Sequence, residues 1–128
     1  MKSYREIQQD FIDKYRITIV ENSKCRQRTH AHVKKRMICK WEPASSIQST
    51  FTLLHEIGHC ETFKGWMRRC ESEYYATQWA LDRCRELGLD VPDKEIDSYQ
   101  RYIYRELDRG LRRYGSGYPS KEEMKLVK

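Results

Sequence analysis

Apolar residues recur at helical spacing along most of the chain. Gly88 and Pro92 interrupt one stretch of this pattern, and Asp93, a residue type that caps helix N-termini, begins the next. The spacing is clearest in four ranges, each of which predicts a helix: 3–14, 45–63, 67–87 and 93–115.

Two short segments between the first and second helical ranges have the character of β-strands. Residues 16–21 are rich in β-branched side chains. Residues 22–31 are predicted to form a polar loop, with room for an additional short strand, and Pro43 ends the sheet. Residues 32–41 alternate imperfectly between a basic face and an apolar face of Val33, Met37, Cys39 and Trp41. The expected fold class is α+β: a small antiparallel sheet of two or three strands packed with about four helices.

The length of the chain, 128 residues, suits one domain with a modest core. We expect residues 1–115 to form this domain and residues 116–128, which show no apolar period, to be a loosely structured basic tail. The charged N-terminus lacks the apolar stretch of a signal peptide, and no apolar run approaches the roughly 20 residues that span a bilayer. Five cysteines without a C-x-x-C pair argue against a disulfide framework. These features favour a cytoplasmic protein with no membrane segment.

The net charge of +6 is concentrated near the predicted sheet. Residues 24–40 contain seven Lys or Arg and no acidic residue. We expect a solvated loop and the outer face of a strand here, and the alternative is a docking surface for an acidic protein or for nucleic acid. Aromatic residues are not interleaved with these charges, so nucleic-acid binding is not favoured.

The sequence LLHEIGHC at residues 53–60 contains an H-E-x-x-H motif. On a helix, His55 and His59 lie one turn apart on the same face, where both ring nitrogens can bind one Zn²⁺ ion. Glu56 projects about 100° away around the helix, beside the metal, where it can accept a proton from water as a general base. The spacing therefore predicts a catalytic zinc helix.

This short motif also occurs by chance in ordinary helices. Here Leu53, Leu54 and Ile57 surround the motif and indicate a buried helix. Gly58 sits in the middle of that helix, where glycine costs about 1 kcal/mol relative to alanine. A glycine at such a position indicates close packing against another element.

A catalytic zinc site needs a third protein ligand and an open fourth position. No histidine follows His59, and His30 and His32 are expected at the surface, so the candidates are carboxylates in CESEYYATQWALDRCREL. Glu71 shares a polar, solvent-facing helical face, whereas Glu73 aligns with an inward-facing stripe of small residues such as Ala76. A metal would compensate the buried charge of Glu73, which we predict to be the third ligand; the alternative is an ion pair with an arginine.

The run STFTLLHEIGHC, followed by EYYATQWAL, resembles the ImmA/IrrE family of zinc metallopeptidases. The resemblance reaches from about residue 15 to 87 and implies a zincin-like active-site helix beside a short sheet. By position it implies that His55, His59 and Glu73 are zinc ligands and that Glu56 is the catalytic base. Thr77 stands where the family has Asn or Asp, a position from which a side chain can orient a ligand histidine.

The resemblance further implies a protease of phage or mobile-element type that cleaves a specific protein substrate, such as a helix-turn-helix transcriptional repressor. We expect an extended substrate to be aligned by strand addition at the sheet edge, formed by Met37, Ile38, Cys39, Lys40 and Trp41. Two alternatives remain. One is a non-catalytic zinc-containing protein that docks a host or mobile-element regulator, and the other is a DNA-associated protein that uses the basic residues 24–40.

Overall fold

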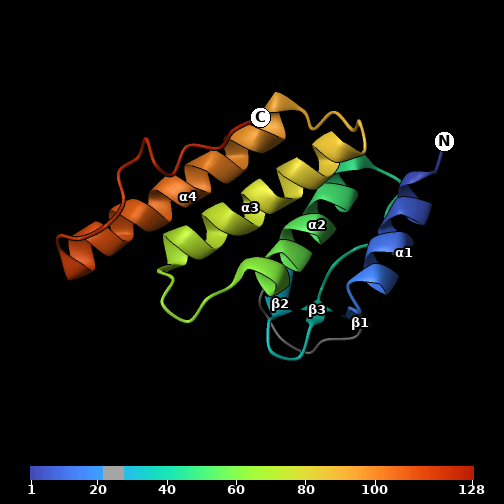
Figure 1. Ribbon diagram of the computed structural model, residues 1–128, viewed down its shortest axis with the longest axis horizontal. Coiled ribbons are helices and arrows are strands. Elements are labelled where there is room, and N and C mark those ends of the chain that lie inside the picture. Colours follow the sequence, from blue (N-terminus) through green and yellow to red (C-terminus); the bar gives the residue numbers. More distant parts are fainter. Residues whose placement is uncertain (22–27) are drawn as a thin grey trace.

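The computed structural model describes residues 1–21 and 28–128, and its fold class is α+β as predicted. Three longer helices lie side by side, with α3 between α2 and α4, while α1 packs on the other side of α2 (Figure 1). A small sheet lies near one end of α2. The helices are α1 (Tyr4–Lys14), α2 (Ile47–Thr62), α3 (Arg69–Glu86) and α4 (Asp93–Tyr114), and the strands are β1 (Thr18–Val20), β2 (His30–His32) and β3 (Met37–Cys39).

The sheet is mixed, so the prediction of an antiparallel sheet is wrong in this respect. Its strand order is β1-β3-β2: β3 pairs with β2 antiparallel and with β1 parallel. The reason is that β3 turns back from β2 and inserts between β2 and β1. The central position buries Ile38 completely, and Ile38 packs with Leu53 and Ile57 of α2.

The predicted strand at residues 32–41 is instead the end of a hairpin, with a turn at residues 33–36. Arg36 adopts a left-handed backbone conformation (φ 52°). Its guanidinium donates to the carbonyl oxygen of Tyr15 (2.7 Å) and to the carboxylate of Glu61 (2.7 Å), which ties the turn to α1 and α2. The single apolar face proposed for this segment is wrong, because Ile38 and Cys39 are both buried although they lie on opposite faces of β3.

The buried apolar residues form two clusters, one among α2, α3 and α4 and one between α2 and the sheet. The α2 helix contributes side chains to both. Phe51 and Leu54 pack with α3 and α4, whereas Leu53 and Ile57 pack against the sheet. Its N-terminus is capped by Ser46, whose hydroxyl accepts from the backbone N–H of Ser49.

Gly58 brings α2 unusually close to α3. A Cβ atom at Gly58 would lie 2.5 Å from the carbonyl oxygen of Ala76. Ala76 and the next inward-facing residue, Ala80, are fully buried. The close packing expected from a mid-helix glycine is therefore confirmed, and it sets the spacing of the two helices.

The prediction of a loosely structured tail at residues 116–128 is wrong. Met124 and Leu126 are 3% and 7% exposed and belong to the core formed with α3 and α4. The side-chain amide of Gln100 binds both sides of this segment: it donates to the carbonyl oxygen of Met124 (2.9 Å) and accepts from the N–H of Leu126 (2.7 Å). The tail runs back along α4 (Figure 1). It is held by single buried apolar side chains and by side-chain amides of the helices. Such contacts produce no periodic pattern in the sequence, so the tail was not recognised as part of the core.

Among the described residues, no helix combines the length and apolar character that a membrane span requires.

Replacement of Leu126 by alanine should lower the free energy of unfolding by about 2 kcal/mol, because it removes a buried anchor at the margin of the core. Val127 is 62% exposed, so Val127→Ala should change the free energy of unfolding by less than about 0.5 kcal/mol. Denaturant unfolding of both variants measures the difference. Equal effects would contradict the docked tail.

Gly58→Ala should destabilise the protein by about 2 kcal/mol. The intrinsic helix preference of alanine, about 1 kcal/mol, acts in the opposite direction, but the new Cβ meets backbone atoms of α3 that cannot rotate away. Gly65→Ala is the matched control, because a Cβ at Gly65 meets nothing within 4 Å. Thermal melting should separate the two variants, and a stabilised Gly58→Ala protein would refute the close contact.

Candidate metal centre

His55, His59 and Glu73 converge on one point between α2 and α3. The Oε2 atom of Glu73 lies 3.1 Å from Nε2 of His55 and 3.3 Å from Nε2 of His59. Tetrahedral zinc with bonds of about 2.0–2.2 Å places neighbouring ligand atoms roughly 3.3–3.5 Å apart. Both separations are therefore close to those of a zinc site, and the structure brings the ligand atoms of the three predicted residues within 4.8 Å of one another. That these residues bind a metal stays a prediction.

Both histidines are oriented by hydroxyl groups of α3. Thr77 donates its only hydroxyl proton to the carbonyl oxygen of Glu73 (2.7 Å), so its Oγ1 accepts from Nδ1–H of His55 at 3.0 Å. Oγ of Ser72 lies 3.1 Å from Nδ1 of His59. A proton on Nδ1 leaves the Nε2 lone pair free to bind a metal. Thr77 has the supporting position that was predicted, whereas Ser72 was missed because serine follows no motif here.

The three donor groups are strongly coupled electrostatically. Burial alone would lower the pKa of His55, but its hydrogen bond to Glu73 and the negative charges of Glu56 and Glu73 raise that pKa above its ordinary value. Burial alone would raise the pKa of Glu73, but the two histidines hold it well below its usual range. Glu73 is therefore a carboxylate, and a metal ion would displace the proton that it shares with His55.

Glu56 lies beside this donor set and does not belong to it. It is 5% exposed, and its Oε1 is 4.0 Å from Nε2 of His55. Its Oε2 is buried without a hydrogen-bond partner among the described residues. Burial raises the pKa of Glu56, against the opposing effect of His55 and His59. A buried carboxylate oxygen without a protein donor, next to a metal-ligand cluster, is suited to receive a proton from water.

Glu71 was predicted to face solvent, and this is wrong. Its side chain is 12% exposed, and its Oε1 accepts from the backbone N–H of Arg68 at 3.1 Å and from the Arg68 guanidinium at 3.3 Å. Glu71 thus caps the first turn of α3. Because Glu71 is engaged in this cap, it is not available as a metal ligand, and Glu73 remains the predicted third ligand.

The donor set opens into a cleft of about 1230 Å³. The cleft is bounded by β2, the exposed side of α2, the start of α3 and the first half of α4. Tyr99 of α4 lines it, with its ring centroid 4.9 Å from that of His55. Burial raises the pKa of Tyr99 to about 12, so it keeps its O–H donor at neutral pH. In the sequence, Tyr99 follows the helical period of the core residues, so no sequence signal indicates that its side chain lines the cleft.

The prediction that Met37, Ile38, Cys39, Lys40 and Trp41 form the edge of the sheet is wrong. Met37, Ile38 and Cys39 form β3, whose backbone is paired on both sides. Lys40 and Trp41 lie beyond β3, and the indole of Trp41 is buried and donates to the carbonyl oxygen of Ser49. The edge strand that borders the cleft is β2. The error arose because the sequence does not reveal which strand takes the central position.

Among the described residues 28–40, the basic side chains do not form one uniform surface. Residues 24–27 lie outside the described residues. Arg36 is engaged with Tyr15 and Glu61, while Lys34 and Lys35 are exposed on the hairpin turn and Arg28 lines the cleft. The expectation of a solvated turn therefore holds for Lys34 and Lys35.

No family model, curated protein or solved structure matches the chain.

Proposed function

We propose that the chain is a zinc-dependent metallopeptidase that cleaves a peptide bond in a specific regulatory protein. The observation that carries this proposal is the convergence of His55, His59 and Glu73 in a cleft open to solvent, beside Glu56, whose buried Oε2 has no hydrogen-bond partner among the described residues. Two histidines, one carboxylate and an open position are the ligand arrangement of hydrolytic zinc sites. Four described cysteines are free, in keeping with a cytoplasmic location.

Each residue has a distinct role in this proposal. A bound zinc ion would supply Lewis acidity and lower the pKa of water to about 7. Glu56 accepts the proton of the attacking water and passes it to the leaving amine. Thr77 holds the imidazole of His55 in the tautomer that binds metal, and Ser72 contacts Nδ1 of His59 and orients that ring. Tyr99 offers its O–H to the carbonyl oxygen on which negative charge develops.

The substrate in this proposal is an extended segment of another protein. Among the described strands, β2 is an edge strand that borders the cleft, and its backbone groups can pair with such a segment by strand addition. Phe63, which is 43% exposed at the cleft, and Met67 offer apolar contacts for the substrate's side chains. The resemblance of the HEIGH and EYYATQWAL segments to ImmA/IrrE proteins favours a transcriptional repressor as the target.

The main alternative is a zinc protein that docks a regulator without cleaving it. Such a protein needs no carboxylate beside the ligands, and burying the Glu56 Oε2 atom without a hydrogen-bond partner would be a cost without a function. The described basic residues of the hairpin give less support to a DNA-associated role, because Arg36 is already engaged by Glu61.

Glu56→Gln should abolish cleavage while zinc stays bound, because Glu56 acts on the proton of water and is not a ligand. We expect a loss of at least about 10²-fold in the rate. To measure cleavage, the protein is added to a proteome from its host cells, and new N-termini are identified by mass spectrometry. Zinc content is measured by elemental analysis.

Glu61→Gln is the matched control on the same helix, because Glu61 lies outside the cleft and pairs with Arg36. It should retain both the cleavage and the zinc. New N-termini that appear equally with wild type and Glu56→Gln would refute the enzyme proposal. Loss of zinc from Glu56→Gln would refute the role assigned to Glu56.

A further inference from the structure

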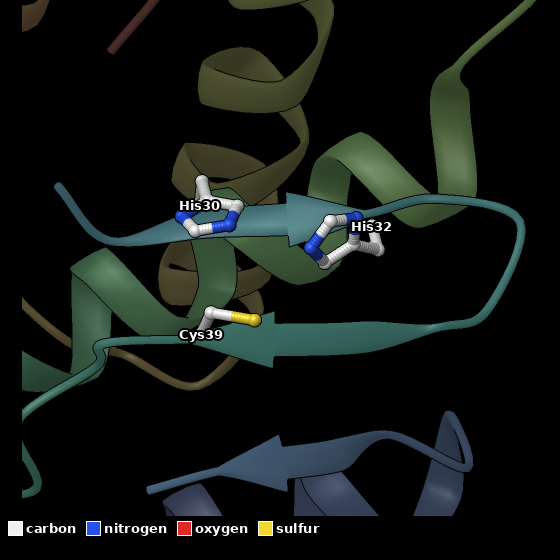
Figure 2. Close-up of side chains that lie close together, drawn as sticks. All are labelled: His30, His32 and Cys39. Atoms are coloured by element: carbon white, nitrogen blue, oxygen red, sulfur yellow. The ribbon is translucent and has the colours of Figure 1, made fainter. Parts of the chain in front are cut away.

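A second group of metal-ligating side chains lies on the face of the sheet that points away from α2, where His32 is exposed, His30 is half-buried and Cys39 is buried. His30 of β2 is paired directly with Cys39 of β3, and His32 follows two residues later on the same face of β2. The opposite face carries Ala31, Ile38 and other apolar side chains that pack toward α2. Figure 2 shows the two imidazoles and the thiol together on one side of the β2–β3 hairpin. The register of the hairpin therefore collects three donors from two strands.

The donor atoms of this group are close enough to share one ion. One ligand atom from each of His30, His32 and Cys39 lies within 4.8 Å of the others. Tetrahedral zinc with these ligand types needs separations of roughly 3.4–3.6 Å. His32 is exposed, so its ring can rotate to close the remaining distance.

His30 is already oriented for ligation. Its Nδ1 donates to the carbonyl oxygen of Arg28 at 2.8 Å, which leaves the lone pair of Nε2 free. A carbonyl acceptor on the far nitrogen of a ligand histidine is the usual support at metal sites. The two imidazole rings lie 5.0 Å apart between centroids, in an edge-to-face arrangement.

We propose that His30, His32 and Cys39 form a second site, for a thiophilic divalent ion of the zinc class. Two imidazole nitrogens and one thiolate suit such an ion, and hard cations such as Mg²⁺ or Ca²⁺ do not bind this donor set. The site differs chemically from the cluster of His55, His59 and Glu73, which contains no sulfur. The inference does not depend on the proposed peptidase activity.

The expected consequence of metal binding is a firmer edge strand. The β2–β3 pairing extends over only three residue pairs, and a metal would join the strands at the His30–Cys39 pair. Because β2 also lines the cleft, the ion would fix the backbone edge against which an extended segment can pair.

Cobalt substitution tests this site directly. The full chain is stripped of metal with a chelator, which is then removed, and Co²⁺ is added while the absorption spectrum is recorded. Wild type should bind cobalt with a thiolate-to-cobalt charge-transfer band in the near ultraviolet. Cys39→Ser should abolish that band and Cys60→Ser, a change at a half-buried cysteine outside the cluster, should leave it unchanged.

His32→Gln provides a second variant that keeps the fold, because the side chain is exposed. It should weaken the cobalt affinity of the thiolate site at least about 10-fold, as expected for loss of a ligand. Absence of the charge-transfer band from wild type, or its persistence in Cys39→Ser, would overturn the proposal.

Glu73→Ala separates this inference from the proposed peptidase site. The variant should lose one bound cobalt per chain yet keep the charge-transfer band, whereas Cys39→Ser should lose the band and keep the other cobalt. If Glu73→Ala loses no metal while Cys39→Ser does, the peptidase proposal fails and the second site stands. If Cys39→Ser binds as much cobalt as wild type, the second site fails alone.

Discussion

The contact between Gly58 of α2 and Ala76 of α3 is the constraint on which the candidate metal centre depends. The metal ligands come from both helices, so their separation is set by the distance between the helix backbones. Gly58 immediately precedes His59, and Ala76 immediately precedes Thr77. A side chain at Gly58 would meet the Ala76 backbone. The absence of a Cβ there allows the carboxylate of Glu73 to come within 3.1 Å of His55, in the middle of an apolar interface.

The polar groups in this interface are buried at a cost that hydrogen bonds largely offset. His55 and Thr77 satisfy each other, and Glu73 satisfies both histidines. Only Glu56 keeps a buried oxygen without a protein partner in this part of the described chain. Such departures from complete hydrogen bonding of buried polar atoms are most often found at functional sites, where they serve the chemistry. Glu56 differs in this respect from the half-buried Glu71 and the buried Glu106, whose carboxylates are paired with arginines.

Helical periodicity was sufficient to predict the directions in which the candidate ligand side chains of α2 and α3 point. The i, i+4 spacing places His55 and His59 on one face, and the phase of α3 turns Glu73 inward. Such predictions succeed because a helix fixes the direction of each side chain relative to its neighbours in sequence. The phase alone did not reveal that Glu71 caps its helix through Arg68, since capping depends on the local backbone at the helix end.

Features that depend on contacts between distant segments could not be predicted in this way. The insertion of β3 between β1 and β2 is decided by pairing across the chain, and three-residue strands carry too little pattern to specify their neighbours. The docking of Leu126 through Gln100 likewise follows no period. Consequently the edge strand was assigned to β3, and the proximity of His30, His32 and Cys39 became visible only in the register of the hairpin.

A crystal structure with anomalous diffraction recorded on both sides of the zinc absorption edge tests the central claim most directly. We expect a zinc peak at bonding distance from Nε2 of His55, Nε2 of His59 and a carboxylate oxygen of Glu73, with the Glu56 carboxylate beyond bonding distance. A zinc-soaked crystal without a peak between α2 and α3, or with Glu56 as a ligand, would contradict it.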